Sequence, residues 1–106
     1  MEDNIFNIPD QLTGEFEQFL PIISNPNIYI ERIISSGHNT PDGQWLEDDR
    51  NEWVLLIRGH SEILLENGET KMLNSGDHIM IGKNKKHRIV KTSKDPDCIW
   101  LAVYFE

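Results

Sequence analysis

The sequence predicts an all-β protein of antiparallel strands, folded as a sandwich or a barrel. Three observations lead to this prediction. Short segments rich in β-branched and aromatic residues follow one another from residue 28 to the end of the chain. Turn-forming residues separate these segments at short intervals. No segment has the long amphipathic period of a helix that would cover a sheet.

Residues 1–27 are expected to be an irregular N-terminal arm that packs on a barrel formed by residues 28–106. Three prolines interrupt this arm, and Asn25-Pro-Asn27 is a strong turn signal. The segment 13–20 fits either a short helix or an edge strand, and its residues do not decide between the two.

The first two expected strands are residues 28–35 and 52–58. Between them, residues 36–49 form a polar loop with proline, glycine and a lone tryptophan, Trp45. Side chains alternate between the two faces of a strand. Because residues 53–57 are apolar at both parities, both faces of the second strand must be covered.

The next two expected strands form a β-hairpin. Residues 61–66 and 69–73 flank Asn67-Gly68, a pair that suits a two-residue turn with positive φ at both central positions. The strand 98–105 is again apolar at both parities. Its outer face must be covered by the second sheet, by the N-terminal arm or by another subunit, and we expect a dimer to provide the cover. Three further strands are expected at residues 78–81, 87–92 and 98–105, of which the last is the strand whose outer face must be covered.

Composition limits the function classes that this chain can serve. At 106 residues it is expected to form one domain. Its net charge of −8 repels phosphate backbones, which argues against nucleic-acid binding. No apolar run is long enough for a membrane span, and the acidic N-terminus does not resemble a secretory signal. One cysteine, Cys98, allows no intrachain disulfide, so we expect a cytoplasmic protein.

The charges are unevenly distributed along the sequence. Residues 83–94 are basic and residues 42–49 are acidic. Such runs are usually solvated loop surface, and the alternative is a basic rim that attracts a small anionic ligand.

Glu52 and His87 are the strongest candidates for a functional site. By strand alternation, Glu52 shares a face with Val54 and Leu56, and His87 shares a face with Ile89. If these faces form the interior, Glu52 needs a partner, because a buried unpaired charge is costly. That partner is a metal, an arginine, a backbone donor or His87 itself. A purely structural role for Glu52, paired with an arginine, also stays open.

At these residues the chain resembles the small single-domain cupins. The first cupin motif runs Gly-x5-His-x-His-x3–4-Glu-x6-Gly, and Glu52 and Gly59 match its second half. The second runs Gly-x5-Pro-x-Gly-x2-His-x3-Asn, and Gly76 and His87 keep its separation. The resemblance covers roughly residues 28–105. It implies an antiparallel cupin β-barrel of the double-stranded β-helix or jelly-roll type.

The first motif departs from the family pattern at its metal ligands. The His-x-His pair falls on Trp45 and Glu47 with one spacing, and on Leu46 and Asp48 with the other. The second motif also differs at three positions, where this chain has Gly82, Asn84 and Lys91.

In metal-binding cupins, two histidines, the glutamate and the later histidine hold a divalent metal. The resemblance transfers this role only to Glu52 and His87. Glu47 is expected as a substitute oxygen ligand and His38 as a further ligand from the preceding loop. Such a set would suit Mn, Fe(II), Zn or Ni. Two other residues, Trp45 and Arg88, are expected around the pocket.

The resemblance implies a pocket but no substrate. One hypothesis is a cupin that binds a small molecule, with or without a metal. If enzymatic, its activity would be of the dioxygenase, isomerase or decarboxylase type. The alternative is a non-enzymatic sensor, accessory or interaction module that has lost the metal site. Either is expected to be a homodimer.

Overall fold

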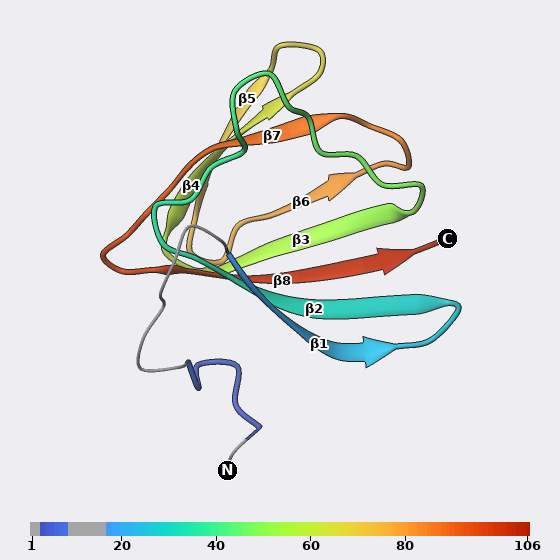
Figure 1. Cartoon of the computed structure of the whole chain (residues 1–106), viewed down its shortest axis with the longest axis vertical. Helices are drawn as coiled ribbons and strands as arrows, with labels where there is room; N and C mark the ends of the chain where they lie inside the picture. Colours follow the sequence, from blue (N-terminus) through green and yellow to red (C-terminus); the bar gives the residue numbers. More distant parts are fainter. Residues whose placement is uncertain (1–2, 9–16) are drawn as a thin grey trace.

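The computed structural model describes residues 3–8 and 17–106, and all regular structure in these ranges is β (Figure 1). Every strand pair is antiparallel, which confirms the predicted fold class. No helix in the described part is long and apolar enough to cross a bilayer. The strands are β1 (Gln18–Ser24), β2 (Ile28–Ser35), β3 (Asn51–Arg58), β4 (His60–Leu65), β5 (Thr70–Asn74), β6 (His78–Ile81), β7 (His87–Thr92) and β8 (Cys98–Phe105).

The strands form two sheets that enclose the core. One sheet has the order β1-β2-β8-β3-β6 and the other the order β5-β4-β7 (Figure 1). Leu56 from β3 and Ile63 from β4 are almost fully buried, so the sheets meet through the inward faces of their central strands. Burying such side chains contributes about 1.5–3 kcal/mol each. The core cluster consists of Val54, Leu56, Ile63, Leu73, Ile81, Cys98 and Trp100.

The N-terminal segment differs from the irregular arm that the sequence predicts. Residues Gln18–Ser24 form β1, the edge strand beside β2. Pro21 fits there because an edge strand has one side without ladder hydrogen bonds, and a register shift follows it between Pro21 and Ile23. Of the ambiguous segment 13–20, residues 18–20 are strand and residues 13–16 lie outside the described residues. In the described segment 3–8, the Ile5 and Asn7 carbonyls accept hydrogen bonds from the buried Arg32.

The predicted β4–β5 hairpin is present, but its turn is longer than expected. Gly68 has a φ of +89°, whereas Asn67 is not among the residues with positive φ. The Gly68 N–H donates to the Leu65 carbonyl, and the Leu65 N–H donates to the Glu69 carbonyl. These bonds close a three-residue loop in which only the final position requires glycine.

The long loop between β2 and β3 runs along β7 and helps to build one end of the cavity. Leu46 and His87 exchange two backbone hydrogen bonds of 2.8 and 3.0 Å. Further along, the Thr40 N–H donates to the Ile89 carbonyl, and the Ile89 N–H donates to the Thr40 hydroxyl. This pairing places the residues that follow Leu46 beside the start of β7.

Candidate functional site

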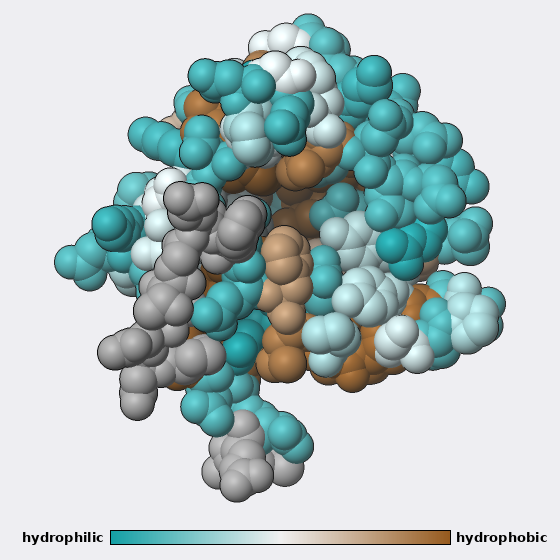
Figure 2. All heavy atoms as spheres, viewed as in Figure 1, coloured by the Kyte–Doolittle hydropathy of each residue, from teal (hydrophilic) through white to brown (hydrophobic). Residues whose placement is uncertain are grey.

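A cavity of about 190 Å³ lies between the two sheets. In Figure 2 the hollow between the upper and lower parts of the molecule shows apolar side chains at its base. The volume is below the ~300–1,000 Å³ of pockets for drug-sized ligands, so this cavity suits a small molecule. Its lining consists of Glu17, Phe19, Ile33, Leu46, Glu47, Asp48, Glu52, Val54, Ile63, Ile81, His87, Ile89, Trp100 and Tyr104.

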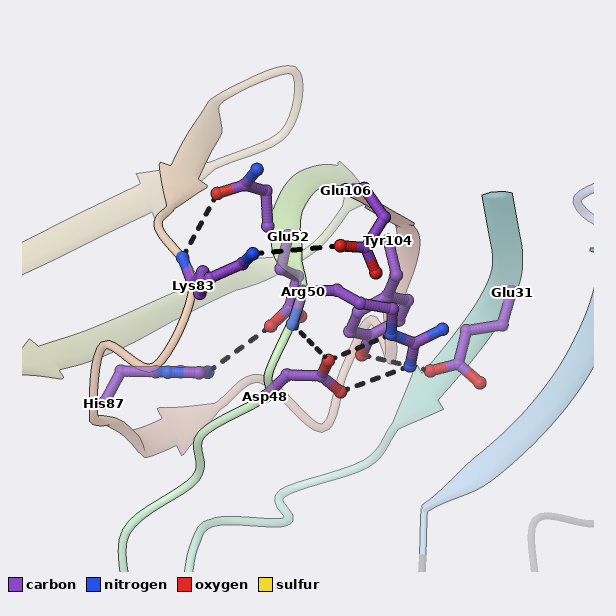
Figure 3. Close-up of polar contacts among 9 residues, drawn as sticks. Glu31, Asp48, Arg50, Glu52, Lys83, His87, Tyr104 and Glu106 are labelled. Carbon is purple, nitrogen blue, oxygen red and sulfur yellow. Dashed lines mark hydrogen bonds and ion pairs between the residues drawn. The ribbon is translucent and has the colours of Figure 1, made fainter. Parts of the chain in front are cut away.

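The structure brings Glu52 and His87 together in this cavity (Figure 3). Glu52 projects from the inner face of β3, and His87 is the first residue of β7 in the opposite sheet. Glu52 is 8% exposed and His87 is 5% exposed. His87 Nε2 lies 3.8 Å from Glu52 Oε1. That distance exceeds a hydrogen bond, so the two groups face each other without a direct bond.

Burial shifts both pKa values toward the neutral forms. Desolvation raises the pKa of Glu52 to about 7, and a hydrogen bond with Tyr104 opposes the rise. Desolvation also lowers the pKa of His87, against the hydrogen bond with the Lys85 carbonyl. The separation is within the range of an ion pair, yet near pH 7 the histidine is neutral and a large fraction of Glu52 is protonated. The two side chains are therefore not held as a fixed salt bridge near pH 7.

The tautomer of His87 follows from its backbone contact. Nδ1 lies 3.3 Å from the Lys85 carbonyl oxygen, which can only accept a hydrogen bond. Neutral His87 therefore carries its proton on Nδ1 and has a lone pair on Nε2. Nε2 has no hydrogen-bond partner among the described residues, and it faces Glu52 across the cavity.

A row of polar side chains continues from Glu52 across the large sheet. Tyr104 on β8 is the register partner of both Glu52 and Tyr29. The Tyr104 and Tyr29 hydroxyls donate to the two oxygens of Glu31, at 3.3 and 3.2 Å. Burial raises the pKa of Glu31 and the pKa of Tyr104. The guanidinium of Arg50 lies 4.7 Å from the Tyr104 ring centroid and offsets part of this negative charge.

The acidic side of the cavity comes from three further residues. Asp48 accepts hydrogen bonds of 3.0 and 3.2 Å from Arg50, and these lower the pKa of Asp48, which stays ionised. Glu17 accepts a hydrogen bond from the Ser35 hydroxyl. Glu47 is exposed at the cavity rim.

Three residues expected at the site are not in the cavity lining. The His38 ring accepts a hydrogen bond from the Ser36 N–H, which holds it in its own loop. Arg88 alternates with His87 along β7, so it points to the other face and lies beside the Trp45 ring, at 5.9 Å. Trp45 itself is 42% exposed.

The donor set does not fit a resident divalent metal. Among the described residues, no group of three or more His, Cys, Asp or Glu side chains is placed to hold a metal ion. Two candidate donors, Glu52 and His87, converge. The others are engaged or displaced: Asp48 is bonded to Arg50, Glu17 accepts from Ser35, Glu47 is exposed at the rim, and His38 lies outside the cavity. Protein metal sites normally use three or more such ligands. The metal expected from the sequence stays a prediction.

No family model and no curated protein matches the chain. Among solved structures, it is similar to a protein from Ralstonia eutropha JMP134 named "putative mannose-6-phosphate isomerase". The two are 30% identical with a TM-score of 0.89, over 97% of this chain and 95% of that one. It is also similar in fold to a cupin superfamily protein from Desulfitobacterium hafniense DCB-2, with 14% identity, a TM-score of 0.73, and coverage of 90% and 82%.

An RmlC-like cupin from Shewanella frigidimarina NCIMB 400 has the same fold, with 14% identity, a TM-score of 0.72, and coverage of 87% and 78%. At this identity the two cupins indicate the fold alone, whereas the Ralstonia protein is a relative over nearly its whole length. These findings confirm the resemblance inferred from the motifs. The chain belongs to the cupin superfamily.

Proposed function

We propose that this cupin binds a small molecule in the cavity between its two sheets, with Glu52 and His87 as the polar groups that contact it. One observation carries the proposal. Two deeply buried titratable side chains meet at 3.8 Å in a cavity without a direct bond to each other. Such groups are costly to bury unless a further partner joins them. A mostly apolar cavity with a few convergent polar groups is typical of a ligand site.

The chemistry of the pair supports proton transfer. Glu52, with a pKa of about 7, can donate or accept a proton at neutral pH, and the free lone pair on His87 can accept one. The Ralstonia relative is named as a putative isomerase of mannose 6-phosphate, so that sugar phosphate belongs in any test of turnover. A sensor or accessory role is the second candidate, favoured by the missing His-x-His pair.

Ligand binding should depend on both residues of the pair. A library of small metabolites, including mannose 6-phosphate, is screened by thermal shift, and hits are measured by calorimetry and assayed for turnover. Glu52→Gln should weaken a hit by about tenfold or more, because a hydrogen bond to a charged group contributes ~1.5–3 kcal/mol. His87→Gln should weaken it by about two- to tenfold, because a hydrogen bond to a neutral ring contributes ~0.5–1.5 kcal/mol. Glu69→Gln and His60→Gln, at exposed positions of the small sheet and its hairpin, are the matched controls. A hit with equal affinity for all five proteins would refute this site.

Metal content gives a separate expectation. Because only two donors converge, protein purified without an affinity tag should contain less than about a tenth of an equivalent of Mn, Fe, Zn or Ni. Elemental analysis before and after dialysis against each metal measures this. A stoichiometric metal that Glu52→Ala or His87→Ala removes would instead establish the metal-binding version of the site.

We also infer that a second copy of the chain covers the outer face of the large sheet. The cross-strand pairs Trp53/Val103 and Leu55/Leu101 present apolar, half-buried side chains on that face. An uncovered apolar face of this kind is typical of an interface.

Sedimentation should therefore show a dimer, twice the 12.3 kDa of one chain, that Leu55→Asp converts to monomer. Val90→Asp, on an exposed position of β7, is the control and should leave the dimer intact. Circular dichroism checks that each variant is folded. A folded, dimeric Leu55→Asp protein would place the interface elsewhere, and a monomeric wild type would remove it.

A further inference from the structure

We propose that the ligand of this cavity is a small organic cation, a primary ammonium group on a short apolar body. The inference rests on the proposed function, since it names the ligand class of the same cavity. Three independent features of the cavity support it: the sign of its charges, the hydrogen-bond character of the two buried groups, and the nature and size of its walls.

The ionisable side chains that line the cavity are acidic apart from the neutral His87, and a cation beside Glu52 favours the ionised form of its carboxyl group. Four carboxylates contribute to the lining, and no lysine or arginine does so among the described residues. Arg50 lies nearby, but its guanidinium is bonded to Asp48 and therefore compensates that carboxylate. Glu17 and Glu47 have no such cation partner in the described part of the chain. A cavity of this sign concentrates cations and repels phosphates. The four carboxylates are those of Glu17, Glu47, Asp48 and Glu52.

The basic segment 83–94 does not change this sign. Lys83 and Lys85 form surface ion pairs with Glu106 and Glu66, and Arg88 points to the opposite face, toward Asp42. None of these cations is part of the cavity lining. The basic rim for an anionic ligand, considered from the sequence, therefore has no counterpart at this site.

The two buried groups present acceptors that converge. His87 Nε2, which has a lone pair, and Glu52 Oε1, which is an acceptor in the ionised form of Glu52, lie 3.8 Å apart (Figure 3). A donor nitrogen about 2.9 Å from each atom, the usual hydrogen-bond length, bridges such a gap. An ammonium group has three N–H donors and can satisfy both acceptors at once, whereas a hydroxyl has one. The same bond replaces the hydration that Glu52 loses on burial.

The walls of the cavity suit the remainder of such a ligand. Phe19, Trp100 and Tyr104 contribute aromatic rings, and a cation near an aromatic face gains about 0.5–2 kcal/mol. Aliphatic side chains such as Ile63 and Ile81 form the deep part. A volume of 190 Å³ holds about six non-hydrogen atoms, if each takes the ~30 Å³ of a liquid water molecule. The size of the cavity therefore favours a short amine over a larger ligand such as a sugar phosphate.

The test compares probes of equal shape and different charge. n-Butylammonium, 1-butanol and butyrate are titrated into the isotopically labelled protein, and amide shifts of the cavity strands are followed by NMR. Mannose 6-phosphate and inorganic phosphate complete the series. We expect butylammonium to bind with a dissociation constant on the order of millimolar, at least tenfold more tightly than butanol, with no saturable binding of the anions. Glu52→Gln should weaken the ammonium tenfold or more, and Glu69→Gln should not change it.

Each other outcome has a defined meaning. If butanol, butyrate or mannose 6-phosphate binds more tightly and Glu52→Gln weakens it, the ammonium class is wrong and the cavity remains the binding site. If no probe shifts the amides of the cavity strands up to saturating millimolar concentrations, the ammonium inference is overturned. If butylammonium binds equally to wild type, Glu52→Gln and His87→Gln, both the inference and the proposed function fail. Binding only after addition of a divalent metal would also overturn the ammonium class, in favour of a metal-held ligand.

Discussion

Replacing Gly59 with alanine will destabilise the protein by about 2–6 kcal/mol, because the new methyl group adds steric overlap to backbone strain. Gly59 joins β3 to β4 with a φ of +99°, which costs a residue with a side chain about 1–3 kcal/mol. An added Cβ would also lie 2.6 Å from the Ser93 hydroxyl and 2.9 Å from the Cys98 sulphur. Forcing such contacts in a packed region costs a further ~1–3 kcal/mol.

The surroundings of Gly59 have little freedom to move away. The Ser93 hydroxyl accepts a hydrogen bond from the His60 N–H and donates one to the Pro96 carbonyl, at 3.1 and 2.7 Å. The Cα of Cys98 would lie 3.1 Å from the new methyl group, and it belongs to the buried start of β8. The clash must therefore be relieved by backbone displacement.

Gly76→Ala is the matched control for this prediction. Gly76 has a φ of +93°, but an added Cβ there meets nothing within 4 Å. Gly76→Ala should lower the free energy of unfolding by about 1–3 kcal/mol, from backbone strain alone. Urea unfolding of the three proteins at one pH measures both losses. Equal losses in the two variants would show that the contacts around Gly59 relax without cost.

Glu52→Gln should become more stable than wild type as the pH rises, with a difference of about 3 kcal/mol above pH 7. The folded pKa of about 7 exceeds the unfolded value of 4.5, so between these pH values the folded wild type binds more protons than the unfolded chain. Its free energy of unfolding therefore falls as the pH rises through that window. Each unit of pKa corresponds to about 1.4 kcal/mol. Glutamine does not titrate, and the variant lacks this loss.

Other groups around Glu52 titrate in both proteins and largely cancel in the difference. His87 has a lowered pKa, so it destabilises the fold as the pH falls below its unfolded value, in the opposite sense to Glu52. Among the nearby acids, Glu31 and Tyr104 have raised pKa values and Asp48 has a lowered one. The cation that faces the Tyr104 ring is Arg50. Glu17 and Glu47 share the cavity.

Thermal and urea unfolding from pH 5 to 8 measures the effect. The difference between Glu52→Gln and wild type should be small near pH 5 and grow toward pH 8. Glu69→Gln, at an exposed position on the β4–β5 hairpin, should give a flat difference over the same range. A flat difference for Glu52→Gln would mean that Glu52 is ionised over this whole range and that burial does not raise its pKa.

The parts of this molecule that were predictable from the sequence are those set by local pattern. Alternation along residues 52–56 places Glu52 on the inner face, and the spacing around Gly59 and Gly76 matches two cupin motifs. Strand alternation and motif spacing can be recognised from the residues of one strand or one turn, without knowledge of the tertiary structure. The edge strand β1 was only partly predictable. An edge strand was one of two alternatives for residues 13–20, and Pro21 reads as a breaker until its position at a sheet edge is known.

The rest of the site depends on pairings between distant segments. Glu31 reaches the Glu52 row only because β8 lies between β2 and β3, and no local pattern specifies that order. Asp48 reaches the cavity because Leu46, two positions before it, pairs with the distant His87. From the sequence alone, acidic residues in a loop are expected to be solvated surface, because the backbone pairing that brings the loop to β7 has no local signal.

The buried indole of Trp100 is an intrinsic fluorescence probe of the cavity. Trp100 forms part of the cavity wall, is 3% exposed, and donates a 3.2 Å hydrogen bond to the Ser35 hydroxyl. Indole emission responds to nearby charge and to water, so a guest that enters the cavity will change the colour or intensity of that emission. Phenylalanine at positions 45 and 53 would leave Trp100 as the single tryptophan. Occupancy can then be read in the unlabelled protein, whatever the guest is.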